Sequence, residues 1–236
     1  MRAITALRKH WPEYCIEAWA LGMFMISASV FTVLFESQGA YLRLAIPNAD
    51  IRRALIGVAM GLTAVILIYS PWGRRSGAHM NPAVTLAFWR LGKISNWGAF
   101  YYTLAQCVGG LLGVLVVEAV CGDAFTTAPV SFIATTPGDA GATWAFVAEL
   151  CISALLMCVV LMVSGSRRYA KWTGWCAGLL VAVYITVEAP LSGMSMNPAR
   201  SLASAWPAGN WSSFWIYLVA PVLGMQAAAA LFVRRA

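Results

Sequence analysis

The sequence predicts an all-α membrane protein with six transmembrane helices and two re-entrant half-helices, arranged as an inverted repeat. Three observations lead to this fold class. The 236-residue chain is 61% hydrophobic and 11% charged, whereas soluble domains average about 25% charged residues. Six apolar windows are long enough to cross a bilayer, which takes about 20 residues each. A twelve-residue motif at residues 76–87 returns at residues 192–203, at a constant offset of 116 residues.

The six predicted spans follow one another along the chain. They cover residues 14–36, 52–71, 96–120, 143–165, 172–190 and 211–233. The first window exceeds the roughly 7–15 apolar residues of a cleavable signal peptide. We therefore expect it to be retained as a transmembrane helix.

Two shorter apolar segments, residues 81–90 and 197–206, each begin at an Asn-Pro pair. Ten helical residues reach about 15 Å, which is half the thickness of a hydrocarbon core. Asn is a favoured N-cap, and Pro suits the first helical position because its missing N–H would be unpaired there. The sequence therefore predicts two half-helices that begin at the midplane of the membrane.

The duplicated motif divides the chain into a first repeat (1–121), a polar inter-repeat loop (122–142) and a second repeat (143–236). Three spans in each repeat turn the second copy upside down relative to the first, and the functional centre of such proteins lies where the copies meet. An alternative is that both Asn-Pro pairs only break helices for packing. The duplication and the midplane position disfavour that alternative.

The net charge of +7 comes from short basic clusters between apolar runs. Nucleic-acid binders instead carry a basic stripe, so we expect no nucleic-acid partner. If both termini are cytoplasmic, 12 of the 16 Lys and Arg residues fall on the inner side, as the positive-inside rule requires. The compact size and short termini lead us to expect a multi-pass protein of a prokaryotic cytoplasmic membrane.

The midplane would combine backbone acceptors with side-chain donors. Carbonyl groups of residues 77–80 and 193–196 would accept hydrogen bonds, and the amides of Asn81 and Asn197 would donate them. Each helix start also carries about half a positive charge. Two such ends would repel cations and orient a passing water molecule, which interrupts a hydrogen-bonded chain for protons.

The segments Ser-Gly-Ala-His-Met-Asn-Pro-Ala-Val-Thr (76–85) and Met-Asn-Pro-Ala-Arg-Ser (196–201) resemble the two Asn-Pro-Ala boxes of the aquaporin (major intrinsic protein) family. The resemblance covers essentially the whole chain. It implies a channel with one pore in each subunit of a homotetramer in the lipid bilayer. It also implies that the pore centre is formed by Asn81, Pro82, Ala83, Asn197, Pro198 and Ala199.

The family's selectivity filter contains an arginine that Arg200 matches. Alignment places Met60, Ile185 and Met194 at the other three filter positions. Strict water channels usually have an aromatic residue and a histidine there, so this chain departs from that pattern. Packing in the protein core is an open alternative for Met60 and Ile185.

Glu17 and Glu149 match buried glutamates of the family, which would accept hydrogen bonds from the re-entrant loops. This role is preferred over a proton relay, although acids inside spans invite a functional interpretation. His79 is expected to be a packed imidazole that positions its loop, with a pH switch as the alternative. Glu188, beside the outer mouth, is expected to be a solvated or paired acid.

The leading hypothesis is passive permeation of water, together with small uncharged solutes such as glycerol, ammonia or hydrogen peroxide. A facilitator of glycerol or other small neutral solutes with little water selectivity is the alternative. A secondary transporter would need ion-coupling groups in the membrane. An enzyme is not expected, because the two histidines form no catalytic or metal-binding pattern and the six cysteines form no Cys-x-x-Cys pair. No cofactor or metal is expected.

Overall fold

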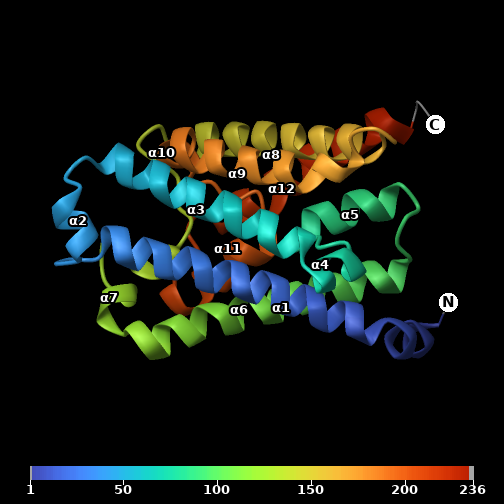
Figure 1. Ribbon diagram of the computed structural model, residues 1–236, viewed down its shortest axis with the longest axis horizontal. Helices are drawn as coiled ribbons and strands as arrows, with labels where there is room; N and C mark the ends of the chain where they lie inside the picture. Colours follow the sequence, from blue (N-terminus) through green and yellow to red (C-terminus); the bar gives the residue numbers. More distant parts are fainter. Residues whose placement is uncertain (1, 234–236) are drawn as a thin grey trace.

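The computed structural model describes residues 2–233, and every regular element in that range is a helix. Six helices are long and apolar enough to cross a membrane, which confirms the six-span prediction (Figure 1). They are α1 (Ala3–Glu36), α3 (Ala49–Tyr69), α6 (Asn96–Cys121), α8 (Ala142–Ser164), α9 (Thr173–Val187) and α12 (Phe214–Val233). A short 3-10 turn, η2 (Ala170–Trp172), precedes α9 and completes the fifth candidate span.

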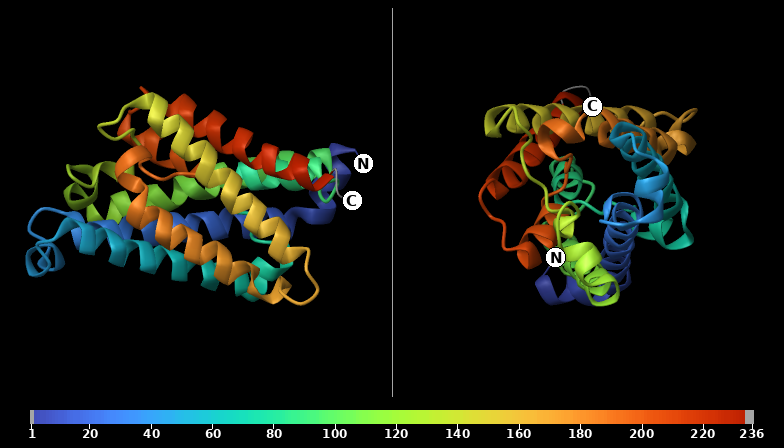
Figure 2. Two further views of the ribbon diagram at one scale, coloured as in Figure 1. Left: turned by 90° about the horizontal axis from the view of Figure 1, so that it is seen from above. Right: turned by 90° about the vertical axis from the view of Figure 1, so that its left-hand side faces the viewer.

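The two half-helices are α5 (Pro82–Arg90) and α11 (Pro198–Ala208). Each is capped by the asparagine of its Asn-Pro pair, whose side-chain oxygen accepts a hydrogen bond from a backbone N–H of the first turn. Viewed end-on, the long helices form a ring whose interior holds the re-entrant segments (Figure 2). Asn and Pro therefore start these helices inside the bundle for the local reasons that the sequence suggested.

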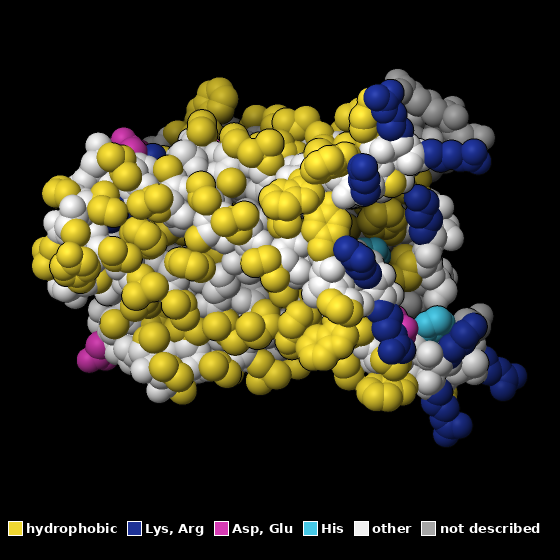
Figure 3. Space-filling view, viewed as in Figure 1, with side chains coloured by type: hydrophobic (Ala, Val, Ile, Leu, Met, Phe, Trp, Pro, Cys, Tyr) yellow, Lys and Arg dark blue, Asp and Glu magenta, His cyan; other side chains and the backbone are white. Residues whose placement is uncertain are grey.

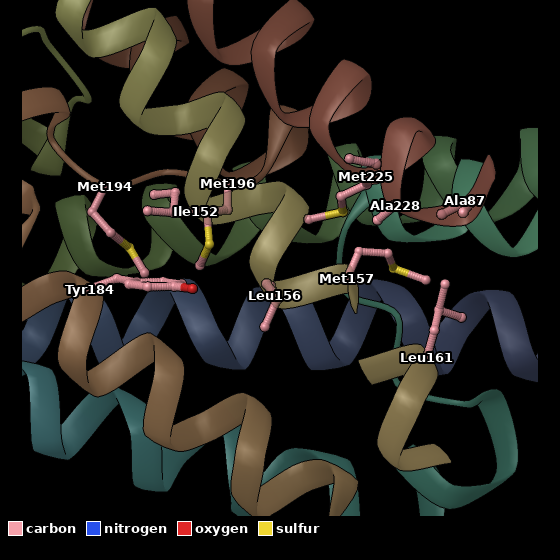
Figure 4. Close-up of a cluster of buried hydrophobic side chains, with 12 residues drawn as sticks. Ala87, Ile152, Leu156, Met157, Leu161, Tyr184, Met194, Met196, Met225 and Ala228 are labelled. Carbon is pink, nitrogen blue, oxygen red and sulfur yellow. The ribbon is translucent and has the colours of Figure 1, made fainter. Parts of the chain in front are cut away.

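Each half-helix packs against a long helix of the opposite half of the chain. Ala87 of α5 lies beside Met225 and Ala228 of α12 in a buried apolar cluster (Figure 4). Ala203 of α11 packs in a second cluster with Val114 of α6. The two halves of the chain are thus interlocked through their re-entrant segments.

Helices α1 and α6 pack along each other, as do their counterparts α8 and α12. The backbones approach closely at Gly109, where an added Cβ atom would lie 2.0 Å from the carbonyl oxygen of Ala18. Helices α3 and α9 also approach closely at Gly61, where a Cβ would lie 2.5 Å from the carbonyl oxygen of Gly178. Small residues permit this packing between membrane helices.

The first helix begins earlier than the predicted window of residues 14–36. Its backbone leaves helical geometry at His10 (φ −123°, ψ 16°), two residues before Pro12. Proline lacks an N–H and its ring crowds the preceding turn, so it kinks a helix at this point. The predicted window therefore corresponds to the part of α1 that follows the kink.

The inter-repeat loop is more structured than a polar linker. It contains α7 (Asp123–Thr126) and a 3-10 turn, η1 (Ser131–Ile133). The side chains of Phe125 and Val130 are buried in the same cluster as Leu21 of α1. Further short helices are α2 (Tyr41–Ala45), α4 (Pro71–Ser76) and α10 (Ala189–Ser192).

The surface divides into an apolar body and a basic end. Hydrophobic side chains cover most of the face shown in Figure 3, and Lys and Arg gather at the end where both termini lie (Figures 1 and 3). Large apolar residues are exposed along every long helix. This distribution fits a protein whose sides contact lipid and whose basic end faces one side of the membrane.

Candidate functional site

The two Asn-Pro pairs meet at the centre of the molecule. The side-chain amide of Asn81 donates to the carbonyl of Met196, and that of Asn197 donates to the carbonyl of Met80, each at 2.7 Å. An amide nitrogen carries two hydrogens, so one on each asparagine remains available after this contact. The residues that follow in each helix start are buried behind the asparagines: Pro82, Ala83, Pro198 and Ala199.

The loops that lead into the half-helices have the same unusual backbone in both repeats. Ala78 (φ 46°) and Met80 (φ 49°) are left-handed, and so are Met194 (φ 48°) and Met196 (φ 54°). Residues with a Cβ rarely adopt this conformation, which costs about 1–3 kcal/mol each. Surrounding groups must hold such loops in place.

Glu17 of α1 holds the first loop. Its carboxylate accepts hydrogen bonds from the backbone N–H groups of His79 (2.9 Å) and Met80 (2.7 Å), and from the side chains of Ser76 and Gln106 (both 2.8 Å). Its side chain is fully buried. Four donors satisfy both carboxylate oxygens, so the Glu17 side chain accepts hydrogen bonds from the backbone of the first loop and from two neighbouring side chains.

Glu149 of α8 holds the second loop in the equivalent way. It accepts from the N–H groups of Ser195 (2.6 Å) and Met196 (2.7 Å) and from the hydroxyl of Ser192 (2.9 Å). It is also fully buried. The two glutamates thus make matching contacts in the two halves of the chain.

His79 is packed rather than free. Its Nδ1 lies 3.1 Å from the hydroxyl oxygen of Thr85, and its ring stacks on Phe88 with a centroid separation of 4.8 Å. The imidazole also forms part of the wall of the central cavity. These contacts fix the ring beside the first re-entrant loop.

A cavity of about 400 Å³ passes the meeting point of the two loops. Both asparagines and both loop backbones line it, as do Ser164 and Thr173 near the basic end and Thr32 and Ile133 near the other end. Most of its other lining side chains are apolar. The cavity therefore extends along much of the bundle, and the asparagines and the two loop backbones give it polar groups at its middle.

The four expected filter residues all line this cavity. Met60 comes from α3, Ile185 from α9, Met194 from the second loop and Arg200 from the first turn of α11. Met60 is 2% exposed and Met194 is 7% exposed. The four residues that the family resemblance placed in the filter therefore come from separate segments of the chain and line one cavity.

Sequence reasoning missed Thr135, which follows η1 in the inter-repeat loop. The Arg200 guanidinium donates a hydrogen bond to the hydroxyl of Thr135. Thr135 belongs to a Thr-rich stretch of the loop that carries no motif. Only the folding of the loop onto the second re-entrant segment brings it to Arg200.

Glu188 differs from the expectation of a solvated or paired acid. It lies directly after α9, and both of its carboxylate oxygens are buried without a hydrogen-bond partner among residues 2–233. Burial raises the pKa of the Glu188 carboxyl to about 7; the nearby Ser192 hydroxyl offsets part of this increase, and the charge of Glu149 adds to it. Glu188 is also the N-cap residue of the short helix α10, which follows it directly.

Comparison with known proteins finds the major intrinsic protein family over residues 7–232. The protein NIP4-1 of Arabidopsis thaliana is 40% identical over 171 residues, which are 72% of this chain and 58% of that protein. The aquaporin NIP2-3 of Zea mays is 34% identical over 216 residues, which are 90% of this chain and 69% of that protein. These relatives come from plants, so they lend no support to the expected prokaryotic membrane.

A solved structure has the same fold. The aquaglyceroporin from Plasmodium falciparum superimposes with a TM-score of 0.81 at 21% sequence identity, covering 94% of this chain and 95% of that one. At this identity the similarity concerns the fold. It supports the six spans and the re-entrant segments as one architecture.

Proposed function

The chain belongs to the major intrinsic protein family, and from this premise we propose that it is a passive channel for water and small uncharged solutes that excludes ions and protons. Its family consists of membrane channels, and the protein is not an enzyme. The observation that carries the proposal is the pair of crossed hydrogen bonds from Asn81 and Asn197 beside a continuous cavity.

Exclusion of cations would arise at the centre. The starts of α5 and α11 point their positive ends at the place where Asn81 and Asn197 meet. Each asparagine keeps one N–H for the oxygen of a passing molecule, because its other N–H is engaged. A water molecule that accepts from both would be unable to relay a proton through the same position.

Selection by size would arise at Arg200, Met60, Ile185 and Met194. Arg200 is the one charged side chain of this group, and its positive charge repels cations in addition to the helix starts at the pore centre. The other three are apolar, and methionine is flexible and adaptable. A filter of this composition favours small neutral solutes more than a filter with an aromatic residue and a histidine would. A facilitator of glycerol-like solutes with little water selectivity is therefore the second candidate.

The organisation of the chain belongs to the same proposal. We assign the repeats to residues 1–121 and 143–236, joined by the loop of residues 122–142, with both termini at the cytoplasmic basic end. The assembly would be a homotetramer in the bilayer with one pore in each subunit. The apolar sides of the subunit supply surface for both lipid and neighbouring subunits.

Stopped-flow light scattering of proteoliposomes tests the function. Vesicles with the protein should swell faster than protein-free vesicles in both water and glycerol gradients. Arg200→Val should increase glycerol permeability relative to water by about threefold or more, because it removes a charge and a bulky side chain from the filter. Water and glycerol fluxes equal to those of protein-free vesicles, or saturable uptake driven by an ion gradient, would contradict a passive channel.

A further inference from the structure

A chain of hydroxyl groups connects Arg200 to the backbone of Asn197. Arg200 donates to Thr135, whose Oγ1 lies 3.3 Å from the Oγ of Ser201. The Oγ of Ser201 lies 2.5 Å from that of Ser195, which donates to the carbonyl of Asn197 at 3.0 Å. The residue at the filter and the residue at the pore centre are thus joined by three side chains.

The donors in this chain can be assigned. Each hydroxyl has one hydrogen to donate, and Ser195 uses its hydrogen on the carbonyl of Asn197. Ser201 must then donate to Ser195, and Thr135 must donate to Ser201. Arginine has donors and no acceptor, so it can only begin the chain. Every hydroxyl hydrogen therefore points in one direction, from Arg200 towards the carbonyl of Asn197, while the backbone N–H of Asn197 donates back to the Ser195 oxygen at 3.3 Å.

The first repeat has a related arrangement that includes no residue of the inter-repeat loop. His79 and Thr85 contact each other at 3.1 Å, and they correspond to Ser195 and Ser201 at the offset of 116 residues. There the third member is Gln106 of α6, which donates to Thr85 at 3.1 Å. In the second repeat this third position is occupied by Thr135 from the inter-repeat loop.

The loop around Thr135 is fixed against the second re-entrant segment. The N–H of Gly138 donates to the carbonyl of Leu191 at 3.0 Å, and a Cβ on Gly138 would lie 1.9 Å from the carbonyl oxygen of Pro190. A Cβ on Gly193 would lie 2.9 Å from the methyl carbon of Thr135. The loop backbone therefore holds the threonine in one place.

We propose that Thr135 is a positioning residue for the selectivity filter, whose hydroxyl holds the Arg200 guanidinium against the wall of the pore. Of the two residues, Arg200 alone lines the cavity, so the hydrogen bond draws the guanidinium away from the lumen. Among the residues that the structure describes, the Thr135 hydroxyl is the acceptor that this guanidinium meets. The assignment of Arg200 to a filter rests on the proposed function, whereas its contact with Thr135 does not.

The test compares Thr135→Val with Thr135→Ser. Valine matches threonine in shape but can neither accept from Arg200 nor donate to Ser201, whereas serine can do both. Thr136→Val is the matched control, because Thr136 is the exposed neighbour. In proteoliposomes, Thr135→Val should lower glycerol permeability relative to water by about threefold or more, since a released guanidinium swings into the lumen and obstructs the larger solute most. Thr135→Ser and Thr136→Val should keep the wild-type ratio.

A second measurement does not depend on permeation. Phenylglyoxal modification of Arg200, followed by peptide mass spectrometry, should be several-fold faster in Thr135→Val than in the wild type, Thr135→Ser or Thr136→Val. Equal modification rates and equal permeability ratios in Thr135→Val and the wild type would overturn the proposal. If only the modification rate changes and the wild-type protein conducts nothing, the positioning role holds and the channel proposal fails.

Discussion

At the scale of single residues, Glu188 is an acid whose two carboxylate oxygens are both buried without a hydrogen-bond partner in residues 2–233. Glu17 and Glu149 are buried more deeply, but backbone N–H groups compensate for the water they lose. Within residues 2–233 no backbone N–H reaches the Glu188 carboxylate, and the hydroxyl of nearby Ser192 donates to Glu149 instead. A buried acid without donors is most stable in its protonated form.

Replacing Glu188 with glutamine should therefore change how stability depends on pH. The carboxyl has a pKa of about 7 when folded and about 4.5 when unfolded, so the folded state binds more protons between these values and loses stability as pH rises through them. The melting temperature of the wild type in detergent should fall between pH 5 and pH 8 more steeply than that of Glu188→Gln. Asp139→Asn, at an exposed acid of the loop, is the control. Parallel curves for Glu188→Gln and the wild type would contradict the assignment.

Residues within the repeated motif could be located from the sequence, and residues outside it could not. Asn81 and Asn197 follow from local rules of helix capping, and Arg200 follows from the resemblance of the second motif to that of the family. Thr135 acquires its surroundings only when the inter-repeat loop folds onto the second re-entrant segment, and Glu188 is buried where α9 meets α10. No spacing in the chain encodes those contacts.

At the scale of elements, the crossing of α1 and α6 depends on Gly109. A Cβ at this position would overlap the backbone of Ala18, which cannot move aside as a flexible side chain can. Gly109→Ala should therefore separate the two helices and destabilise the protein by about 1–3 kcal/mol, as overpacking does. Thermal unfolding in detergent measures the change, with Leu112→Ala on the exposed face of α6 as the control. An unchanged melting temperature for Gly109→Ala would show that the helices tolerate a wider separation.

The long helices were predictable because the thickness of the bilayer sets the number of consecutive apolar residues that a spanning helix needs. Short elements were not, because four or five helical residues leave no clear period in the sequence. The loop containing α7 illustrates this, since its polar composition conceals Phe125, which is buried among residues of the first span. The part of α1 before Pro12 was not predicted for a different reason. It lies outside the apolar window, and a hydropathy pattern detects only the apolar part of a helix.

At the scale of the whole molecule, the two halves of the chain complete each other. The first half-helix packs on α12 and the second on α6, while α3 and α9 pack across the same boundary. The loops also exchange hydrogen bonds at the centre. An inverted repeat of this kind should respond to matching substitutions in the two halves in nearly the same way.

Asn81→Ala and Asn197→Ala test this symmetry. Each substitution removes one cap and one donor to the opposite loop, leaving a buried carbonyl unpaired, so each should destabilise the protein by about 1–3 kcal/mol.

The two asparagines support the same junction, so their effects on stability should not add. The double variant should lose less stability than the sum of the two single variants, by about 0.5–3 kcal/mol. Melting temperatures of the four proteins in detergent give the coupling, and Asn48→Ala, which removes the N-cap of α3, serves as a distant reference that should add independently. Strict additivity of Asn81→Ala and Asn197→Ala, or very unequal single effects, would mean that the two half-helices are anchored separately and that the junction is not shared.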